Sequence, residues 1–149
     1  DLGDFQAALA EVSLDLAQQL QSDAEGASHD IAIRVVNAAS EEDAVVVGRS
    51  VARNNLFKAA IFGNDPNWGR VLAAIGTTDA AFDPYDVDVW FNGVRVCSAG
   101  GPDRPREEVD LTPRATDILI DLKVGQAEAT ILTNDLTHDY VHENSAYSS

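Results

Sequence analysis

The chain has 149 residues, of which 45% are hydrophobic and 23% are charged, and its formal net charge is −15 at pH 7. This length and composition suit one globular domain with a core of its own and exclude a disordered chain. The large negative charge argues against nucleic acid and anionic membranes as partners, because both attract Lys and Arg. It favours small cationic ligands instead.

The chain contains one cysteine, and no apolar run in it is long enough to span a membrane. A single cysteine cannot form an internal disulfide, so a reducing, cytoplasmic compartment is expected. The chain has no methionine and opens almost directly into a helical pattern. Both features are unusual for a translated N-terminus, so we expect a processed or truncated piece of a longer protein.

Two kinds of periodicity mark the first part of the chain. Apolar residues keep helical spacing over about residues 4–24, which predicts an amphipathic helix that ends near Gly26. Ile31, Ile33 and Val35 then alternate with smaller or polar neighbours, as the residues of a strand do.

A second helix is predicted after Ser40. The stretch Ser40-Glu41-Glu42-Asp43 resembles a capping box in which Asp replaces the usual Glu or Gln. The helix that it opens is expected to bury Ala44, Val47, Gly48 and Val51. Residues 56–62 fit either a continued helix or a buried strand, and periodicity does not decide between them.

The stretch Phe62-Gly63-Asn64-Asp65-Pro66-Asn67-Trp68-Gly69-Arg70 combines a turn, a helix start, an indole and a guanidinium. Asp65 followed by Pro66 predicts an N-cap with proline at the first helical position. The apolar stripe of a short helix ending near Gly76 follows, at Trp68, Val71, Leu72 and Ile75. On spacing alone this is a capped core helix; the alternative is a polar site at its N-terminus, built from Asn64, Asp65, Asn67 and Arg70.

The second half of the chain changes to a period of two. Alternating apolar runs on both sides of Asn92-Gly93 predict a hairpin, because Asn-Gly is the strongest short-range hairpin signal. Residues 98–106 are rich in Gly and Pro and are expected to form a surface loop. Another alternating run, from Ile118 to Val124, is expected to turn at Gly125 into a second hairpin.

Together these patterns predict an α+β fold, with helices packed on a mixed or antiparallel sheet and two hairpins in the C-terminal half. No internal repeat or linker divides the sequence, so residues 1–149 are expected to form a single unit. The tail after Leu136 is expected to form one or two helical turns.

Two regions carry polar side chains that could bind a ligand. Glu25 lies where the first helix is expected to end; most such glutamates are simply exposed, although a carboxylate near a cleft would suit the ammonium group of an amino acid. The tail from Asn144 to Ser149 is small and polar and would normally fray. The preceding and neighbouring residues nevertheless supply apolar anchors, at Tyr140, Val141 and Tyr147.

His138 and His142 have the spacing of the two zinc-binding histidines in a His-Glu-x-x-His helix. A third ligand is not obvious, because Glu143 is adjacent and His29 is remote in sequence, so we expect no metal site. Cys97 is expected to be a small buried hydrophobe and not a nucleophile, since the sequence offers no paired base.

Arg70 could hold a carboxylate in bidentate fashion, or it could pin a neighbouring loop. We keep it as a second-tier site candidate, together with Lys58 and Asn64. No Gly-rich phosphate loop occurs in the sequence, because Gly100-Gly101 is followed by proline and not by a helix start.

Two longer motifs resemble a known family. Ala59-Ala60-Ile61-Phe62-Gly63 runs into Asp65-Pro66-Asn67-Trp68-Gly69-Arg70, and the tail runs from Thr133-Asn134-Asp135-Leu136-Thr137-His138 to Glu143-Asn144-Ser145-Ala146-Tyr147-Ser148-Ser149. Both strongly resemble the ornithine acetyltransferases of arginine biosynthesis, and the resemblance covers the whole chain. It implies transfer of an acetyl group from N-acetylornithine to glutamate, which gives ornithine and N-acetylglutamate.

The resemblance further implies a precursor that cleaves itself before a threonine, which becomes the N-terminal nucleophile of the second subunit and forms an acyl-enzyme. This chain resembles only the C-terminal part of that subunit, so no catalytic residue is expected in it. The implied partners are the α chain of the same precursor, with an oxyanion hole, and the missing part of the β chain, in an α2β2 heterotetramer. No metal or organic cofactor is implied.

The resemblance also assigns substrate-binding residues. In that family the glutamate of the Asp-Ala-Glu-Gly stretch contacts ornithine, and Glu25 matches it. The substrate-binding asparagine and the last residue of the family match Asn144 and Ser149. The alternative function, different in class, is a non-catalytic acidic module that binds an amino acid or regulates, because the sequence names no nucleophile–base pair.

Overall fold

The computed structural model describes residues 28–135 and 142–143. The helices are α2 (Glu41–Ala52), α3 (Asn55–Phe62) and α4 (Trp68–Ile75), and the 3-10 turns are η1 (Pro84–Asp86) and η2 (Arg106–Glu108). The strands are β1 (Asp30–Ala38), β2 (Asp88–Phe91), β3 (Val94–Ser98), β4 (Gly101–Pro102), β5 (Ala115–Asp121), β6 (Ala127–Asn134) and β7 (His142–Glu143).

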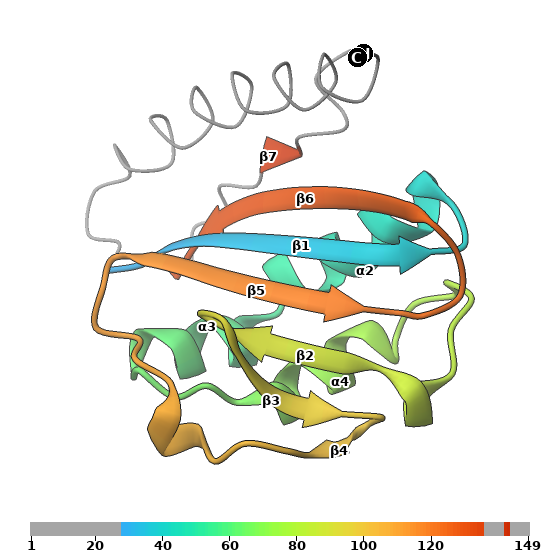
Figure 1. Cartoon of the computed structure of the whole chain (residues 1–149). Coiled ribbons are helices and arrows are strands. Elements are labelled where there is room, and N and C mark those ends of the chain that lie inside the picture. Colours follow the sequence, from blue (N-terminus) through green and yellow to red (C-terminus); the bar gives the residue numbers. More distant parts are fainter. Residues whose placement is uncertain (1–27, 136–141, 144–149) are drawn as a thin grey trace, which may run out of the picture.

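One mixed sheet of seven strands forms the centre of the molecule, in the order β4-β3-β2-β5-β1-β6-β7. Strand β1 lies between β5, to which it is parallel, and β6, to which it is antiparallel. The described helices cover the same face of this sheet (Figure 1). The α+β fold class predicted from the sequence is therefore confirmed.

Helix α2 begins where the sequence predicted. The Ser40 side chain is the N-cap and accepts a hydrogen bond from the Asp43 backbone N–H at 3.0 Å. The capping box is only half formed, because the Asp43 carboxylate accepts from the Ala81 N–H at 3.1 Å. The four residues expected to be buried on this helix are buried, namely Ala44, Val47, Gly48 and Val51.

Helix α3 settles the ambiguity of residues 56–62. Asn54 caps its start by accepting from the Phe57 N–H at 2.9 Å. At its end the Asn64 N–H donates to the Ile61 carbonyl and the Asp65 N–H donates to the Ala60 carbonyl, at 2.9 and 2.8 Å. This pattern is a Schellman motif, and Asn64 has the left-handed φ of 56° that the motif requires.

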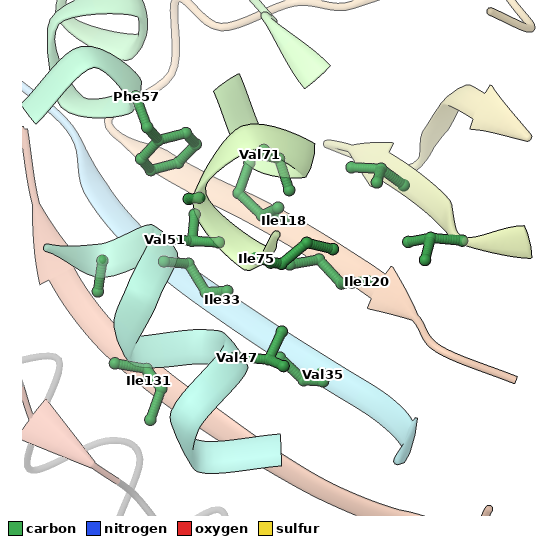
Figure 2. Packing of buried hydrophobic residues seen from close by; sticks show 14 of the residues in the cluster. Ile33, Val35, Val47, Val51, Phe57, Val71, Ile75, Ile118, Ile120 and Ile131 are labelled. Atoms are coloured by element: carbon green, nitrogen blue, oxygen red, sulfur yellow. The ribbon is translucent and has the colours of Figure 1, made fainter. Parts of the chain in front are cut away.

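The core lies between the helices and the sheet (Figure 2). Ile31, Ile33 and Val35 point from β1 toward the helices and are fully buried, as their alternation predicted. Branched side chains from two helices interdigitate with the strands in Figure 2, and Phe57 of α3 closes the end of the cluster. The other contributors from the helices are Val47, Val51, Val71 and Ile75, and those from β5 and β6 are Ile118, Ile120 and Ile131.

One of the two predicted hairpins is confirmed and the other is wrong. Strands β2 and β3 pair across Asn92-Gly93, whose φ angles of 48° and 84° are those of a tight hairpin turn. Strands β5 and β6 do not pair with each other, because β1 lies between them. Alternation identified both runs as strands, but it carries no information on which strand lies beside them.

The connection from β5 to β6 passes close to the end of β1. A Cβ on Gly125 would lie 2.3 Å from the Ala38 carbonyl oxygen, so only glycine fits there. The predicted loop at residues 98–106 is mostly irregular and contains the two-residue strand β4. Among the described residues, no helix is both long and apolar enough to cross a lipid bilayer.

Candidate functional site

The residues expected to bind substrate lie at the two ends of the chain. Glu25, Asn144 and Ser149 are outside the described residues, as is His138. Strand β7 pairs antiparallel with β6, with His142 opposite Leu132, so the tail returns to the sheet just before Asn144. Residues 142–143 form a short strand, and the rest of the tail for which helical turns were predicted lies outside the described residues. The helical spacing that suggested a zinc ligand at His142 therefore does not apply there.

The start of helix α4 differs by two residues from the prediction. Asn67, and not Asp65, is the N-cap, and its side-chain oxygen accepts from the Arg70 N–H at 3.2 Å. The Asp65 carboxylate instead accepts from the Arg106 guanidinium at 3.3 Å and from the Asn67 amide at 3.4 Å. Pro66 is buried ahead of the helix and not at its first position. The predicted apolar stripe and the end at Gly76 are as expected.

The structure gives the second-tier candidates three different environments. Lys58 is 2% exposed on the inner side of α3. Asn64 is exposed, and its backbone ends α3. Arg70 is exposed in the first turn of α4, and its guanidinium has no hydrogen-bond partner in the part of the chain that the structure describes. Of these three, Arg70 is the side chain best placed to meet an anion.

Cys97 is buried, as predicted. Its thiol donates to the Val87 carbonyl at 3.6 Å. Burial, with the nearby charge of Asp88, raises the pKa of Cys97 to about 11. The thiolate is therefore scarce at neutral pH, which rules Cys97 out as an activated nucleophile.

Asp88 is the centre of an ion-pair network at the β2–β3 end of the sheet. It is 5% exposed and accepts from Lys123 Nζ at 2.9 Å and from the Ala99 N–H at 2.8 Å. Burial alone would raise the pKa of Asp88, but these donors and Arg95 outweigh it and hold the pKa below its ordinary value. The network joins the start of β2 to residues Ala99 and Lys123, which follow β3 and β5. Because its pKa is lowered and its oxygens are paired, Asp88 is a poor candidate for a base.

The densest buried polar arrangement lies where β1 begins and β6 ends. We call Ser28, His29, Leu111 and Asp135 the strand-end cluster. Asp135 Oδ1 accepts from the backbone N–H groups of Ser28 and His29 at 2.9 and 3.0 Å. Asp135 Oδ2 lies 2.6 Å from His29 Nδ1 and also accepts from the Ser28 hydroxyl. His29 Nε2 lies 2.7 Å from the Leu111 carbonyl oxygen.

Both ring nitrogens of His29 face oxygen acceptors, so the protonated imidazolium, in which both nitrogens are donors, satisfies both contacts. The imidazolium and the Asp135 carboxylate then form an ion pair, and this pair is buried, since His29 and Asp135 are 4% and 5% exposed. Burial would raise the pKa of Asp135, but hydrogen bonds from Ser28 and His29 outweigh it and lower the pKa. The carboxylate is thus ionised and satisfied at neutral pH.

A serine, a histidine and an aspartate in contact invite comparison with a hydrolase triad. In such a triad the aspartate holds one ring nitrogen and the other nitrogen takes the proton of the serine. Here Ser28 and Asp135 both contact Nδ1, and the Leu111 carbonyl occupies Nε2. Neither ring nitrogen of His29 is therefore available to act as a base or to bind a metal ion.

Sequence reasoning missed this cluster, because His29 and Asp135 are 106 residues apart. The only local signal was a histidine directly before a predicted strand. Within residues 28–135 and 142–143, no group of histidine, cysteine and acidic side chains could hold a metal ion.

Two hollows open on the described surface. One, of about 420 Å³, is lined in part by Ala32, Arg34 and Thr130. These residues alternate along β1 and β6 with the buried Ile31, Ile33 and Ile131, so the hollow lies on the sheet face away from the helices. The other, of about 570 Å³, lies beside α2 and mixes acidic and basic side chains, including Glu42, Arg49, Arg53 and Asp79. Neither contains any of the second-tier candidates.

Comparison with known proteins gives one family. The model of the ArgJ family matches residues 1–149. The chain is 63% identical over 145 residues to the arginine biosynthesis bifunctional protein ArgJ of Streptomyces coelicolor, and 58% identical over 149 residues to that of Thermobifida fusca. These alignments cover 97% and 100% of this chain.

A solved structure supports the same relation. The crystal structure of arginine biosynthesis bifunctional protein ArgJ from Bacillus halodurans superposes with a TM-score of 0.79 at 30% identity, covering 94% of this chain and 68% of that one. The chain spans only 38% and 39% of the length of the Streptomyces and Thermobifida proteins.

Proposed function

Since this chain belongs to the ArgJ family, we propose that it is the C-terminal part of the β chain of an acetyltransferase. The complete enzyme moves an acetyl group from N-acetylornithine to glutamate and yields ornithine and N-acetylglutamate. The observation that carries the proposal is the family match over the whole chain. The relatives are named bifunctional proteins of arginine biosynthesis, which agrees with this reaction.

In the proposed mechanism the nucleophile lies outside this chain. A threonine freed by self-cleavage attacks the acetyl carbonyl, and its α-amine takes the hydroxyl proton. The amide C–N bond then breaks, and ornithine leaves with that proton while the acetyl group stays on the threonine oxygen. The amine of glutamate next attacks this ester and takes the acetyl group, which restores the threonine hydroxyl. The chemistry of the described residues supports this division of labour. Cys97 is held as a thiol, and both nitrogens of His29 are engaged. The described part of the chain therefore offers no nucleophile–base pair.

We propose that this chain contributes substrate binding. The carboxylate of Glu25 suits the ammonium group of ornithine, and the amide of Asn144 and the terminal carboxylate of Ser149 supply further polar contacts. Arg70 is a second-tier candidate for a substrate carboxylate, because its guanidinium is exposed at the start of a helix. Lys58 and Asn64 rank below it, since one is buried and the other ends a helix.

The proposed partners are the α chain of the same precursor and the remainder of the β chain, in a cytoplasmic α2β2 assembly. Two exposed apolar surfaces among the described residues could contact these partners. Leu56 and Phe62 of α3 are 57% and 59% exposed on either side of Ala59, which is also exposed. The sheet face opposite the helices carries the 420 Å³ hollow, lined in part by Trp90 and Leu119. Apolar surface of this kind is typical of protein interfaces.

The first test is to express the complete precursor, determine intact masses under denaturing conditions, and sequence the N-terminus of each chain. We expect a companion chain and a chain beginning at threonine, together with acetyl transfer from N-acetylornithine to glutamate. A single uncleaved chain without transfer would contradict the proposal.

The binding residues are tested in the same enzyme. Glu25→Ala should raise the KM for N-acetylornithine by about tenfold or more with little loss of thermal stability, because the proposal gives this carboxylate a role in binding and none in folding. Deletion of Ser148 and Ser149 should also impair substrate use. Glu128→Ala is the control, since this glutamate is exposed and pairs only at the surface with Arg34. Unchanged KM values in both variants would contradict the assignments.

The second candidate is a non-catalytic module that binds an amino acid. It is favoured by the lack of a nucleophile–base pair among the described residues. Calorimetry with ornithine and the chain alone, beside the activity assay of the complete precursor, separates the two. Binding without any transfer in the precursor would favour the module.

A further inference from the structure

We propose that the hollow beside α2 binds an α-amino acid with a positively charged side chain, of the class of arginine, lysine and ornithine. The hollow has a volume of about 570 Å³, which is within the range of small-molecule sites. One wall is helix α2 and the other is formed by residues 77–80, which follow α4. The Ala81 N–H joins the two walls by donating to the Asp43 carboxylate at 3.1 Å. The site shares no residue with the proposed substrate-binding set, and the inference does not depend on the proposed function.

The α2 wall carries opposite charges at its two ends. Four of its residues line the hollow at spacings of four, three and four, which places them on one stripe of the helix: Glu42, Val46, Arg49 and Arg53. Glu42 and Arg53 are eleven residues apart, so their Cα atoms are about 16 Å apart along the helix axis. The hollow is therefore acidic toward the start of α2 and basic toward its end.

The charges at these ends are not paired with each other. Other arginines of the chain have a carboxylate beside them, as Arg95 has Asp103 at 2.6 Å. Glu42, Arg53 and Asp79 form no side-chain hydrogen bond or ion pair with any residue of 28–135 or 142–143. In all, three carboxylates and two guanidinium groups line the hollow, which gives it a net charge of −1. A basic amino acid, with a net charge of +1 at neutral pH, is the complementary ligand.

Each part of such a ligand has a counterpart in the hollow. Asp79 is two residues from Ala81 and so lies at the same end as Glu42, where both suit the side-chain cation. The guanidinium of Arg53 suits the α-carboxylate, because it can donate to both oxygens at once. Between the two ends, Val46 is 38% exposed and would be covered by the aliphatic part of the ligand.

Hydroxyl groups in the hollow favour the α-ammonium group as well. Ser50, Thr77 and Thr78 line the hollow, and each hydroxyl donates at 2.7 Å to the carbonyl three residues earlier. Their protons are therefore engaged, and the oxygens are left to accept. An ammonium group supplies the donors that these oxygens need, whereas a phosphate supplies none. The hollow thus suits a zwitterion with a second cation better than a simple anion.

The first test is a calorimetric titration of the complete precursor protein with L-arginine, L-citrulline and agmatine. L-Citrulline has nearly the shape of arginine but a neutral side chain, and agmatine lacks the carboxylate. We expect saturable binding of L-arginine with a Kd of about 1 mM or lower. Each analogue should bind at least about threefold more weakly, because each loses one exposed charge contact. Equal affinity for all three compounds would overturn the inference, as would no saturable binding of L-arginine up to about 10 mM.

The second test places the binding in this hollow. Arg53→Gln and Glu42→Gln should each raise the Kd for L-arginine by about threefold or more, because each removes one charge. Arg34→Gln is the control and should leave the Kd unchanged, since Arg34 is also exposed but lines the other hollow. Melting curves check that the three variants are folded. The same Kd in Arg53→Gln, Glu42→Gln and the wild type would overturn the inference, and because heat and not turnover is measured, the result is independent of acetyl transfer.

Discussion

Strands β1 and β6 are held together by different interactions in the middle and at one end. In the middle, Ile33 lies opposite Ile131 and both are fully buried. Helix α2 packs closely over Ile131 and the neighbouring Val35 at Gly48. At the end, the strand-end cluster joins His29 to Asp135 through charge and hydrogen bonds. The first region is apolar and the second is polar, although Ile33, Ile131, His29 and Asp135 are all buried.

The two regions should respond differently to small chemical changes. Apolar burial has no direction and scales with area, so the loss of one methyl group costs little. A buried ion pair depends on the charge and direction of each partner, so an isosteric change that removes a charge is costly. Equal burial therefore does not mean equal tolerance.

The largest effect should come from emptying the apolar region. Phe57→Ala should lower the free energy of unfolding by about 3–5 kcal/mol, because Phe57 is fully buried between α3 and the sheet. Phe62→Ala on the same helix is the matched control and should change it by less than about 0.5 kcal/mol, because Phe62 is 59% exposed. Urea denaturation followed by circular dichroism measures both. Similar losses of unfolding free energy in the two variants would mean that burial does not determine the effect of removing a phenylalanine side chain.

The direct comparison of the two regions uses two near-isosteric changes on and beside β6. Asp135→Asn should cost about 3 kcal/mol, because it leaves His29 without its counter-ion in a buried site. Ile131→Val removes one methylene from the core and should cost about 1 kcal/mol. The same urea titrations measure both at neutral pH. A smaller loss in Asp135→Asn than in Ile131→Val would refute the distinction between the regions.

The smallest effect should be a change in how steeply the free energy of unfolding falls at acid pH. The pKa values of Asp135 and Asp88 are lowered in the folded state, so the stability that they contribute is fully present above about pH 4 and is lost as pH falls through their folded-state pKa values. The urea midpoint of the wild-type protein should fall below that pH. The fall should be shallower in Asp135→Asn, which lacks one of the two groups, and an identical fall in both proteins would exclude Asp135 as a contributor.

Much of the fold could be predicted because it depends on neighbours in the sequence. The alternation around Ile33 predicted β1, Ser40 predicted the start of α2, and Asn92-Gly93 predicted the β2–β3 hairpin. Each of these signals acts within a few residues, through side-chain periodicity, a capping side chain or a turn conformation. The motif around Trp68 likewise predicted the family, with α4 displaced only at its start.

Tertiary structure decided what neighbours in sequence cannot. Asp65 does not cap α4, because its carboxylate accepts a hydrogen bond at 3.3 Å from Arg106, which is distant in sequence. Strand β1 entered between β5 and β6 because insertion there buries its apolar face and satisfies both of its edges at once. His29 and Asp135 met for the same reason: pairing β1 with β6 brings their ends together, and a buried charge there is stable only beside its counter-charge. Local patterns specify which segments are strands and helices, whereas their neighbours depend on burial and polar pairing summed over the whole chain.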